Sequence, residues 1–361
     1  MHIMNLRENQ TKDSPKKTIL VSIIIVNYNG IKFIESCLNS VLNSDYPNFE
    51  VIFVDNASTD GSYELVNRLF GSDKRLKIIR NSKNLGFTGG NNIGFKYAKG
   101  IYIIFLNNDT EVSRNWIKIL VEIIESDLMI GAAQCKLLNL YDKRQIDSAG
   151  QFIDFLGYGY PLDNEEDKEQ YDHVKAIFYA DGAALIVRRS VINQVSLNGL
   201  PFDLDYFPIY YEDADLCWRV RLRGYKVVVI PTSIVYHART AAKLHKMSSY
   251  LIFSHAKNRI MTLIKNYGLG NLIKYLPLLL FFETIRAIIL LKTKPDHSIA
   301  ILKAILWNLK NLKKTWKKRL IVQHFIRRVP DPYIMRYMVK FTPTHLYNSF
   351  KKYYNLSEVR A

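Results

Sequence analysis

The chain has 361 residues, which is enough for one large domain or two, with a sizeable core. Its formal net charge is +17, but residues 292–361 alone carry 16 Lys and Arg against three acids, so residues 1–291 carry only +4. This distribution excludes a uniformly basic surface, and the basic end can meet either nucleic acid or the anionic face of a membrane. The cysteines, Cys37, Cys135 and Cys217, lack metal-type spacing and are predicted to be core residues in a reducing compartment.

The first part of the chain alternates apolar strands with amphipathic helices. Residues 1–17 are polar and charged, and we expect a flexible tail without a signal peptide. Residues 19–27 form a nearly continuous apolar run, which is typical of a buried parallel strand. Further strands are predicted at 50–55, 76–80 and 101–106, with helices between them at 31–42, 60–69 and 88–98. The pattern predicts an α/β fold, a Rossmann-like and mostly parallel sheet flanked by helices, which binds ligands at the carboxyl ends of its strands.

Beyond residue 131 the expected elements become shorter. Strands are predicted at 132–138, 176–187 and 225–230, where Pro231 is expected to end the strand, and a helix is predicted at 213–223. The acidic residues 163–172 are expected to form a solvated flap. From residue 246 the pattern is helical and increasingly basic. We therefore expect a tail (1–17), a catalytic domain (18–245) and a C-terminal helical basic region (246–361).

Residues 272–291 are long and apolar enough to raise the question of a membrane helix. Charges at the centre of a bilayer are costly, and this segment contains Lys274, Pro277, Glu283 and Arg286. A helix lying on the membrane surface is favoured, and a buried helix and a single span stay open as alternatives. The basic residues that follow are mixed with Leu, Ile, Trp307 and Trp316, a composition that favours a membrane surface over nucleic acid.

Polar residues follow several of the predicted strands. Asp55 precedes the turn after the second strand, where it can accept hydrogen bonds from a base imide or a ribose hydroxyl, while Asp60 is better placed to cap a helix. Asp109 follows the fourth strand and suits a hard divalent cation that bridges a diphosphate. Residues 84–92 are rich in glycine and lead into a helix, so they form either a phosphate-binding or sugar-binding loop or an ordinary connection.

Residues 210–219 hold three carboxylates within four positions. Such a cluster repels itself unless a cation, a catalytic role or solvent compensates. On a helix, Asp215 points about 200° away from Asp213 and is predicted to pair with Arg219. Asp213 and Glu212 are then the two acids of this cluster that are left for a catalytic role.

Six motifs in a fixed order carry a family resemblance: VSIIIVNYNG, VDNASTDGS, NLGFTGGNNIGF, FLNNDT, DGAALIVRR and YYEDADLCWRVRLRGYK. With these motifs, residues 19–237 resemble a family 2 glycosyltransferase of the GT-A fold, and most of all its rhamnosyltransferase-like branch. The resemblance divides the catalytic domain into a nucleotide-sugar half (18–112) and an acceptor half (113–245).

The resemblance implies an inverting transfer from a nucleoside-diphosphate sugar, with a dTDP-rhamnose-like donor favoured, to a lipid-linked or cell-envelope glycan. A UDP- or GDP-hexose donor, or a polyprenyl phosphate acceptor, is the alternative, and a nucleic-acid-binding protein is the alternative of another class. The expected location is the cytoplasmic face of the membrane. The implied donor-binding residues are Asn27, Asn29, Asp55, Asn84, Gly86, Gly89, Gly90, Asn91, Asn107 and Asn108.

The same resemblance assigns the remaining roles. Asp213 and Glu212 are the implied catalytic residues, and Mg²⁺ or Mn²⁺ would be held by Asp109 and His237. The expected acceptor-binding residues are Asp181, Gly182, Tyr211 and Trp218. Core packing of Trp218, and of His237, stays open. In one departure, Asn107 stands where the family pattern has an aspartate, so metal binding is expected to be weaker and a metal-independent enzyme stays possible.

Overall fold

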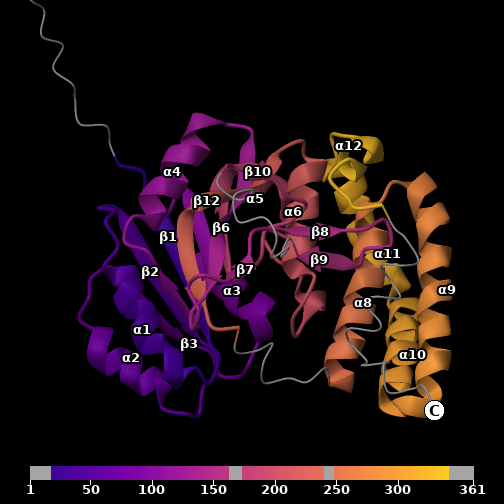
Figure 1. The fold of residues 1–361 in the computed structure, drawn as a ribbon, viewed down its shortest axis with the longest axis horizontal. Coiled ribbons are helices and arrows are strands. Elements are labelled where there is room, and N and C mark those ends of the chain that lie inside the picture. The colour runs from indigo at the N-terminus through magenta and orange to yellow at the C-terminus, as the bar shows by residue number, and fades with distance from the viewer. Residues whose placement is uncertain (1–17, 162–172, 240–247, 341–361) are drawn as a thin grey trace, which may run out of the picture.

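The computed structural model describes residues 18–161, 173–239 and 248–340 (Figure 1). The predicted tail, the acidic stretch 163–172 and the last 21 residues therefore lie outside the described residues. In the rest of the chain the predicted α/β class is confirmed, with a mostly parallel sheet, helices on both faces and a separate group of C-terminal helices.

In the main sheet, β4 (Tyr102–Asn107) and β1 (Val21–Asn27) lie near the centre, and β2 (Phe49–Asp55) and β3 (Leu76–Arg80) extend from β1 to one edge. The order of the strands is β10 (Lys175–Ala176), β12 (Lys226–His237), β6 (Ile130–Asn139), β11 (Ala184–Arg188), β4, β1, β2 and β3. The strands β1 to β4 are parallel, whereas β11 runs antiparallel between β4 and β6. Short strands β5 (Thr110–Val112) and β7 (Ile146–Ser148) pair with β12 and β6. As a result, β1, β2, β4 and β12 end close to one another.

Alternating side chains of the central strands fill two cores, one on each face of the sheet. Ile23 and Ile25 of β1 face α1 (Ile31–Leu42), α2 (Ser62–Phe70) and α4 (Trp116–Ser126). Ile24 faces the other core, which includes side chains of α3 (Gly86–Tyr97), α5 (Arg189–Val195), α6 (Glu212–Leu222) and α8 (Ser249–Asn266). This two-sided burial explains why β1 is almost wholly apolar.

The C-terminal helices pack beside α6 and extend away from the sheet (Figure 1). After α8 come α9 (Leu269–Thr293), α10 (Pro295–Lys310), α11 (Leu312–Ile321), a short π-helix η3 (Val322–Ile326) and α12 (Asp331–Met335). The helix α9 is the outermost and packs on α8 and α10. Among the described helices, none combines the length and the apolar character needed to cross a bilayer.

Two predicted strands differ from the observed ones. The expected strand 176–187 is divided into β10 and β11, and the turn between them contains Asp181 and Gly182. Pro231 does not end β12, because the register shifts between Ile230 and Ile234 and the ladder resumes after the irregularity. In addition, β8 (Gln151–Ile153) and β9 (Gly159–Pro161) form a small second sheet. The prediction of three buried cysteines is confirmed, and all three are free thiols.

Candidate active site

Side chains at the ends of β1, β2 and β4 are joined through Asn27. Asn108 donates to the Asn27 side-chain oxygen at 2.7 Å, and the Asn27 amide donates to Asp55 at 3.3 Å and to Ser58 at 3.1 Å. Gly30 is needed beside this contact, because a Cβ there would lie 2.1 Å from the Asn108 amide nitrogen. The structure thus brings together the polar residues predicted at three separate strand ends.

A hollow of about 480 Å³ opens beside the ends of β2 and β3, and residues 57–59 and 80–82 line it. Arg80 and Asn81 supply the polar groups of one wall, and Ser58 and Thr59 supply the other. Asn29, in a left-handed conformation, accepts from the Thr59 backbone at 2.8 Å and so fixes that side of the rim. The size and the hydrogen-bonding groups suit a heterocyclic base or a ribose.

Asp55 lies beneath this hollow and does not line it. Its side chain is fully buried and accepts from the Ser58 backbone at 3.0 Å, and the Arg80 Nε lies 3.8 Å away. A direct contact between Asp55 and a nucleobase, which the family resemblance implies, is therefore not available in this arrangement. Asp55 instead supports the two groups that face the hollow, Ser58 and Arg80.

The predicted glycine-rich loop is mostly helix. The helix α3 begins at Gly86, so Gly89, Gly90 and Asn91 lie inside it and not in a loop. Gly90 allows α3 to approach β1, because a Cβ there would lie 2.5 Å from Val26. The Asn91 amide donates to the Phe87 carbonyl at 3.0 Å within the helix. The predicted helix 88–98 includes these three residues and is confirmed, and their contact with a donor stays a prediction.

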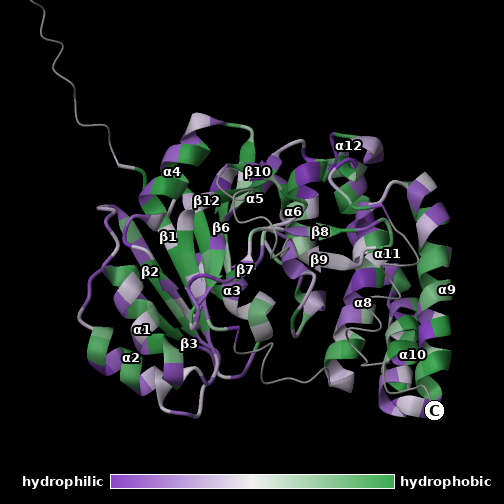
Figure 2. Cartoon of the chain, in the orientation of Figure 1, coloured by the Kyte–Doolittle hydropathy of each residue, from purple (hydrophilic) through white to green (hydrophobic). Residues whose placement is uncertain are grey.

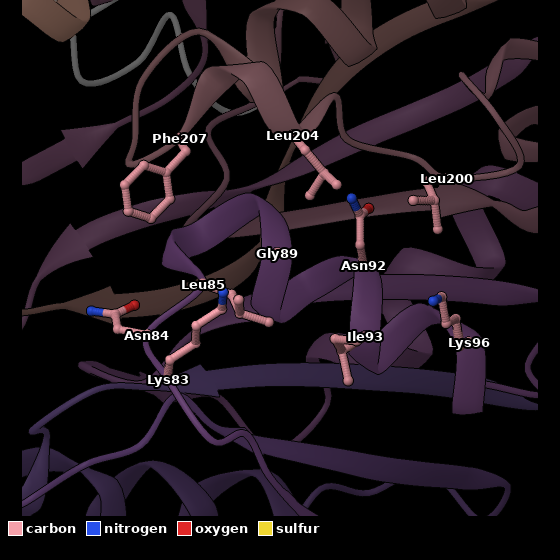
Figure 3. Close-up of a pocket in the computed structure, with 10 residues that line it drawn as sticks. All are labelled: Lys83, Asn84, Leu85, Gly89, Asn92, Ile93, Lys96, Leu200, Leu204 and Phe207. Atoms are coloured by element: carbon pink, nitrogen blue, oxygen red, sulfur yellow. The ribbon is translucent and has the colours of Figure 1, made fainter.

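Asn84 and Gly86 remain at the N-terminal end of α3. The Asn84 side chain accepts from the Gly86 backbone at 2.8 Å. Asn84 and Gly89 also line a hollow of about 430 Å³ along α3 (Figure 3). Its other lining residues come from α3, from the loop before it and from residues 200–207: Lys83, Leu85, Asn92, Ile93, Lys96, Leu200, Leu204 and Phe207.

Asp109 and His237 meet where β4 and β12 end. The His237 Nε2 lies 3.3 Å from an Asp109 oxygen, and its Nδ1 lies 2.8 Å from Asp147 on β7. Although burial lowers it, the contacts with the two carboxylates raise the pKa of His237 to about 10. Arg239 pairs with Asp147 on its other side. The ring is therefore oriented by Asp147 and presents Nε2 towards Asp109, as in a carboxylate–histidine–metal arrangement.

Few side chains near Asp109 and His237 could bind a metal ion. Among the described residues, no group of three or more His, Cys, Asp and Glu side chains is arranged to hold a metal ion. Asp109 and His237 each keep about a tenth of the side chain accessible. One carboxylate and one imidazole fit a cation that takes its other ligands from water and substrate phosphates, which is the usual situation for Mg²⁺.

The turn 181–183 connects the end of β4 with α6. The Asn107 backbone donates to the Ala183 carbonyl at 3.0 Å, and the Gly182 backbone donates to an Asp213 carboxylate oxygen at 3.1 Å. Asp181 accepts from the Ala183 backbone at 2.9 Å, within the turn. The turn 181–183 thus links Asp213 to Asn107 at the end of β4 through these hydrogen bonds.

The three acids of α6 have different environments. Burial, together with the neighbouring charge of Asp181, raises the pKa of Asp213 to about 7. Burial and the charge of Asp213 raise the pKa of Glu212 well above its usual value. Burial opposes ionisation of Asp215 as well, but Lys265 and Arg219 lower its pKa. The predicted pair of Asp215 and Arg219 is confirmed at 3.0 Å.

Trp218 and Tyr211, both predicted to contact the acceptor, lie in different environments. Trp218 is fully buried and packs edge-to-face on Phe178 and Tyr267. The predicted acceptor contact of Trp218 is therefore wrong, because no part of its ring is accessible to a sugar. Tyr211 is partly accessible at the start of α6, and its hydroxyl donates to the Gly157 carbonyl at 2.8 Å.

Three residues of the site were missed in the sequence. Asp147 lies in a short strand without a recognisable pattern, so nothing near it indicates its contact with His237. Ser58 belongs to a quoted motif, but a serine in a turn is too common a signal to single out. Arg80 ends a predicted strand, and its position beside the end of β2 is the signal that could have found it.

Residues 22–194 match the sequence profile described as "Glycosyl transferase family 2". The match likens this part of the chain to a family 2 glycosyltransferase domain. An uncharacterized glycosyltransferase from Haemophilus influenzae is 27% identical over 294 residues, which cover 80% of this chain and 85% of that protein. The match covers the first five motifs except Val21 and ends before the sixth, at 210–226, and most of the observed strands lie within the matched residues.

Two further likenesses are more limited. The Escherichia coli "UDP-Glc:alpha-D-GlcNAc-diphosphoundecaprenol beta-1,3-glucosyltransferase WfaP" is 40% identical over 90 residues, which are 25% of this chain and 35% of that protein. A Pyrobaculum calidifontis mannosyltransferase, solved with GDP-Man and Mn²⁺, has a TM-score of 0.52 at 18% identity and covers 82% of this chain and 88% of its own. The chain spans from 25% to 85% of the first relatives that it matches. The structural likeness supports the GT-A fold.

Proposed function

We propose that this glycosyltransferase moves a sugar from a nucleoside diphosphate to a hydroxyl of a lipid-linked or cell-envelope glycan, with inversion at the anomeric carbon. The observation that carries the proposal is the carboxylate of Asp213, which is half-buried, accepts a hydrogen bond from the Gly182 backbone and has a pKa of about 7. A general base is most effective when its pKa lies near the working pH.

The proposed reaction is a single displacement. Asp213 removes the proton from the acceptor hydroxyl as its oxygen attacks the anomeric carbon, while the bond to the diphosphate breaks on the opposite face. Burial and the neighbouring charge of Asp213 raise the pKa of Glu212 well above its usual value, which favours the protonated form of this acid. Two neighbouring acids whose pKa values are pushed apart can take different roles. We therefore assign the role of base to Asp213, which accepts the proton, while Glu212 is the neighbouring acid that is harder to ionise.

The proposed nucleotide site is the hollow at the ends of β2 and β3. Arg80, Asn81, Ser58 and Thr59 offer the charge and the hydrogen bonds for a base and a ribose. Asn107 and Asn108 precede Asp109 at the end of β4, and Asn108 is linked through Asn27 to Ser58 of the hollow, so a diphosphate that leaves the hollow would pass along the end of β4. Asn84 and Gly86 stay candidate donor contacts at the start of α3.

Asp109 and His237 are the residues that would hold a divalent cation, oriented from behind by Asp147. A bound cation would neutralise charge on the leaving diphosphate. The mannosyltransferase solved with Mn²⁺ supports a divalent metal for this fold. Asn107, which adds no charge, fits a weaker metal site than an aspartate would give.

The donor and acceptor are the finer part of the proposal. The branch resemblance favours a dTDP-rhamnose-like donor, whereas the name of the Escherichia coli relative favours UDP-glucose. The same name supports an acceptor that is linked through a diphosphate to a polyprenol. The hollow at the ends of β2 and β3 would not distinguish thymine from uracil, because both bases have the same imide edge for hydrogen bonds with Arg80 and Asn81.

A donor screen tests the proposal. Purified enzyme is incubated with dTDP-rhamnose, UDP-glucose and GDP-mannose and with a synthetic polyprenyl-diphosphate glycan, with Mn²⁺ or with EDTA. We expect release of one nucleoside diphosphate, product formation that depends on Mn²⁺, and an anomeric configuration opposite to that of the donor, measured by NMR. A product that retains the donor configuration would contradict the single displacement.

The proposal includes contact with a membrane through α9 and α10. Glu283 and Arg286, two of the charges that argued against a membrane span, are buried and pair with each other, and Arg259 of α8 pairs with the same Glu283. The opposite face of α9 exposes large apolar side chains, Phe281 at 58% and Ile288 at 65%. The other exposed members of this apolar face are Ile273, Leu278, Ile285 and Ile289 on α9 and Ile299, Leu302, Leu306 and Leu309 on α10.

Charge favours an anionic bilayer over a second protein copy as the occupant of this apolar face. Residues 292–340 carry 13 Lys and Arg against two acids, so two copies brought together here would repel each other. Apolar side chains flanked by lysines suit the boundary between headgroups and acyl chains. Figure 2 shows α9 as the outermost helix, with apolar positions along much of its length.

Flotation with vesicles tests the membrane contact. A double substitution of Phe281→Glu and Ile288→Glu is expected to abolish flotation with vesicles of phosphatidylcholine and phosphatidylglycerol, and Leu128→Glu, an exposed leucine far from α9, serves as the control. Activity on a water-soluble acceptor should stay unchanged. Wild-type protein that fails to float, but forms a dimer which the double substitution dissociates, would overturn the proposal in favour of self-association. Binding to DNA without binding to lipid would also overturn it.

A further inference from the structure

The loop before α6 has a conformation that its residues do not favour by themselves. Tyr210 and Tyr211 have φ values of 82° and 71°, in the left-handed region. Bulky residues are rarely found there, and two in succession are rarer. Tyr211 is also the residue that precedes α6, and its carbonyl accepts the first-turn hydrogen bond from Asp215 at 2.8 Å. Whatever holds this loop therefore also sets the start of the helix that carries Asp213.

Two adjacent side chains of α8 bind the carbonyl groups of this loop. Lys257 Nζ donates to the carbonyls of Asp205 at 2.7 Å and Phe207 at 3.0 Å. The Asn258 amide nitrogen donates to those of Tyr206 at 3.2 Å, Ile209 at 3.1 Å and Tyr210 at 2.8 Å. Between Asp205 and Tyr210, only the carbonyl of Pro208 is bonded elsewhere, to the backbone of Phe87 at 3.3 Å.

The burial of both α8 side chains makes these contacts energetically important. Lys257 and Asn258 are almost fully buried, and burial lowers the pKa of Lys257 to about 8. The Asn258 side-chain oxygen has no hydrogen-bond partner in the part of the chain that the structure describes. The amide is thus oriented by its nitrogen, which points at the loop. His255, one turn earlier, stacks on Tyr210 with ring centroids 4.1 Å apart.

We propose that Lys257 and Asn258 are positioning residues of the transfer reaction, which hold residues 205–211 in the strained conformation that sets Asp213 against Gly182. Carbonyl groups that lost these donors would turn towards water or towards the adjacent helix, and Tyr210 and Tyr211 would leave the left-handed region. The first turn of α6 would then move with Tyr211. The inference rests on the proposed role of Asp213 as base and adds that its position is imposed by α8, beyond the residues that match the family profile.

The test compares two buried asparagines. Asn258→Leu removes the three loop contacts, whereas Asn308→Leu on α10 removes a buried amide that donates to the Lys257 carbonyl of α8 and to the Ala304 carbonyl of α10, with no contact to the loop. We expect both variants to lose stability, but only Asn258→Leu should lower kcat, by roughly 10- to 100-fold, because a small displacement of a reacting group has effects of that size. The donor KM and the affinity for the free nucleotide should stay the same.

A second readout is the pH dependence of kcat. Asp213 is faced by Asp181 from the turn before β11, by Glu212 beside it and by Tyr179. If Asn258→Leu moves Asp213 towards water, its pKa should fall and the acidic limb of the profile should shift to lower pH. Asn308→Leu should leave the profile in place. Lys257→Arg keeps the donors and the charge and should recover most of the activity lost in Lys257→Met.

The outcomes separate this inference from the proposed function. Equal kcat values and equal pH profiles for the Asn258→Leu and Asn308→Leu variants would overturn the positioning role, whatever the role of Asp213. If Asn258→Leu does not fold, the same comparison is made between Lys257→Met and Lys257→Arg, and equal activities there would overturn it. Near-normal turnover of Asp213→Asn would instead overturn the proposed base itself.

Discussion

The ends of the central strands and the interface between α6 and α8 are both polar, but they are built differently. At the strand ends, mostly neutral side chains bind one another, as in the contacts of Asn27 with Asn108 and Ser58. At the helix interface, full charges are buried and compensated, since Lys265 contacts Asp203 at 2.8 Å and Asp215 at 3.0 Å. The first arrangement can accept a charged ligand, whereas the second has already neutralised its charges internally.

This difference divides the basic residues of the C-terminal region into two groups. Lys257 and Lys265 of α8 are buried and bind carbonyls or carboxylates of the catalytic domain, whereas the buried Arg259 pairs with Glu283 of α9. Lys303 and Lys310 of α10 are exposed beside the apolar face. A count of charges along the sequence treats these residues alike. In the structure, one group joins the helices to the active site and the other remains available for an external partner.

The largest expected effect is the loss of activity on Asp213→Asn. An amide cannot accept the proton, so turnover should fall by about 10²–10⁴-fold, while nucleotide binding at the strand ends persists. Because the pKa of Asp213 is raised to about 7 in the folded protein, ionisation of this residue destabilises the fold as pH rises from the usual range of a carboxyl towards neutrality. The variant should therefore unfold at a higher temperature than wild type above pH 7, and not in acid. Equal melting temperatures at pH 8 would contradict the assigned burial.

Next comes Lys265→Met, which tests whether the helix interface is already neutralised. It leaves Asp203 and Asp215 buried with one cation fewer each, and the expected loss is about 3–5 kcal/mol of unfolding free energy. Urea unfolding measures it. Arg114→Met, which removes an exposed pair with Asp45 at 3.0 Å, is the control and should change the free energy by less than about 1 kcal/mol. Similar losses in the two variants would remove the contrast between the regions.

The smallest effect is expected for Asp147→Asn, which tests the proposed metal ligands. The substitution keeps the shape beside His237 but weakens the orientation of its ring, and Mn²⁺ should bind about 10- to 100-fold more weakly. Calorimetric titration of Mn²⁺ in the presence of a nucleoside diphosphate measures this. Asp127→Asn, a surface carboxylate paired with Lys226, should have no effect. Unchanged Mn²⁺ affinity in the Asp147 variant would argue against His237 as a ligand.

The sequence predicted much of the fold because its signals are local. An apolar run of the length of β1 forms a strand that is buried on both faces, and polar residues directly after such strands come together once the strands are parallel. The pair of Asp215 with Arg219 follows from helical spacing alone. The prediction failed where the same residue type fits two different local structures. A proline is expected to end a regular strand, but a β-bulge allows β12 to continue past Pro231. Glycines close together in the sequence occur both in loops and in helices that pack closely on a sheet, so the start of α3 at Gly86 was not predicted.

What the sequence determined by itself is therefore the order of the elements, the likeness of residues 22–194 to a family 2 glycosyltransferase and the identity of the candidate catalytic acids. Only the tertiary structure decided which of those groups are accessible. Trp218 is in the core, Asp55 is buried beside Ser58 and Arg80, Asp147 faces His237, and Lys257 and Asn258 hold a loop about 50 residues earlier in the chain. Burial and long-range hydrogen bonds depend on how the elements pack, and no local pattern encodes them.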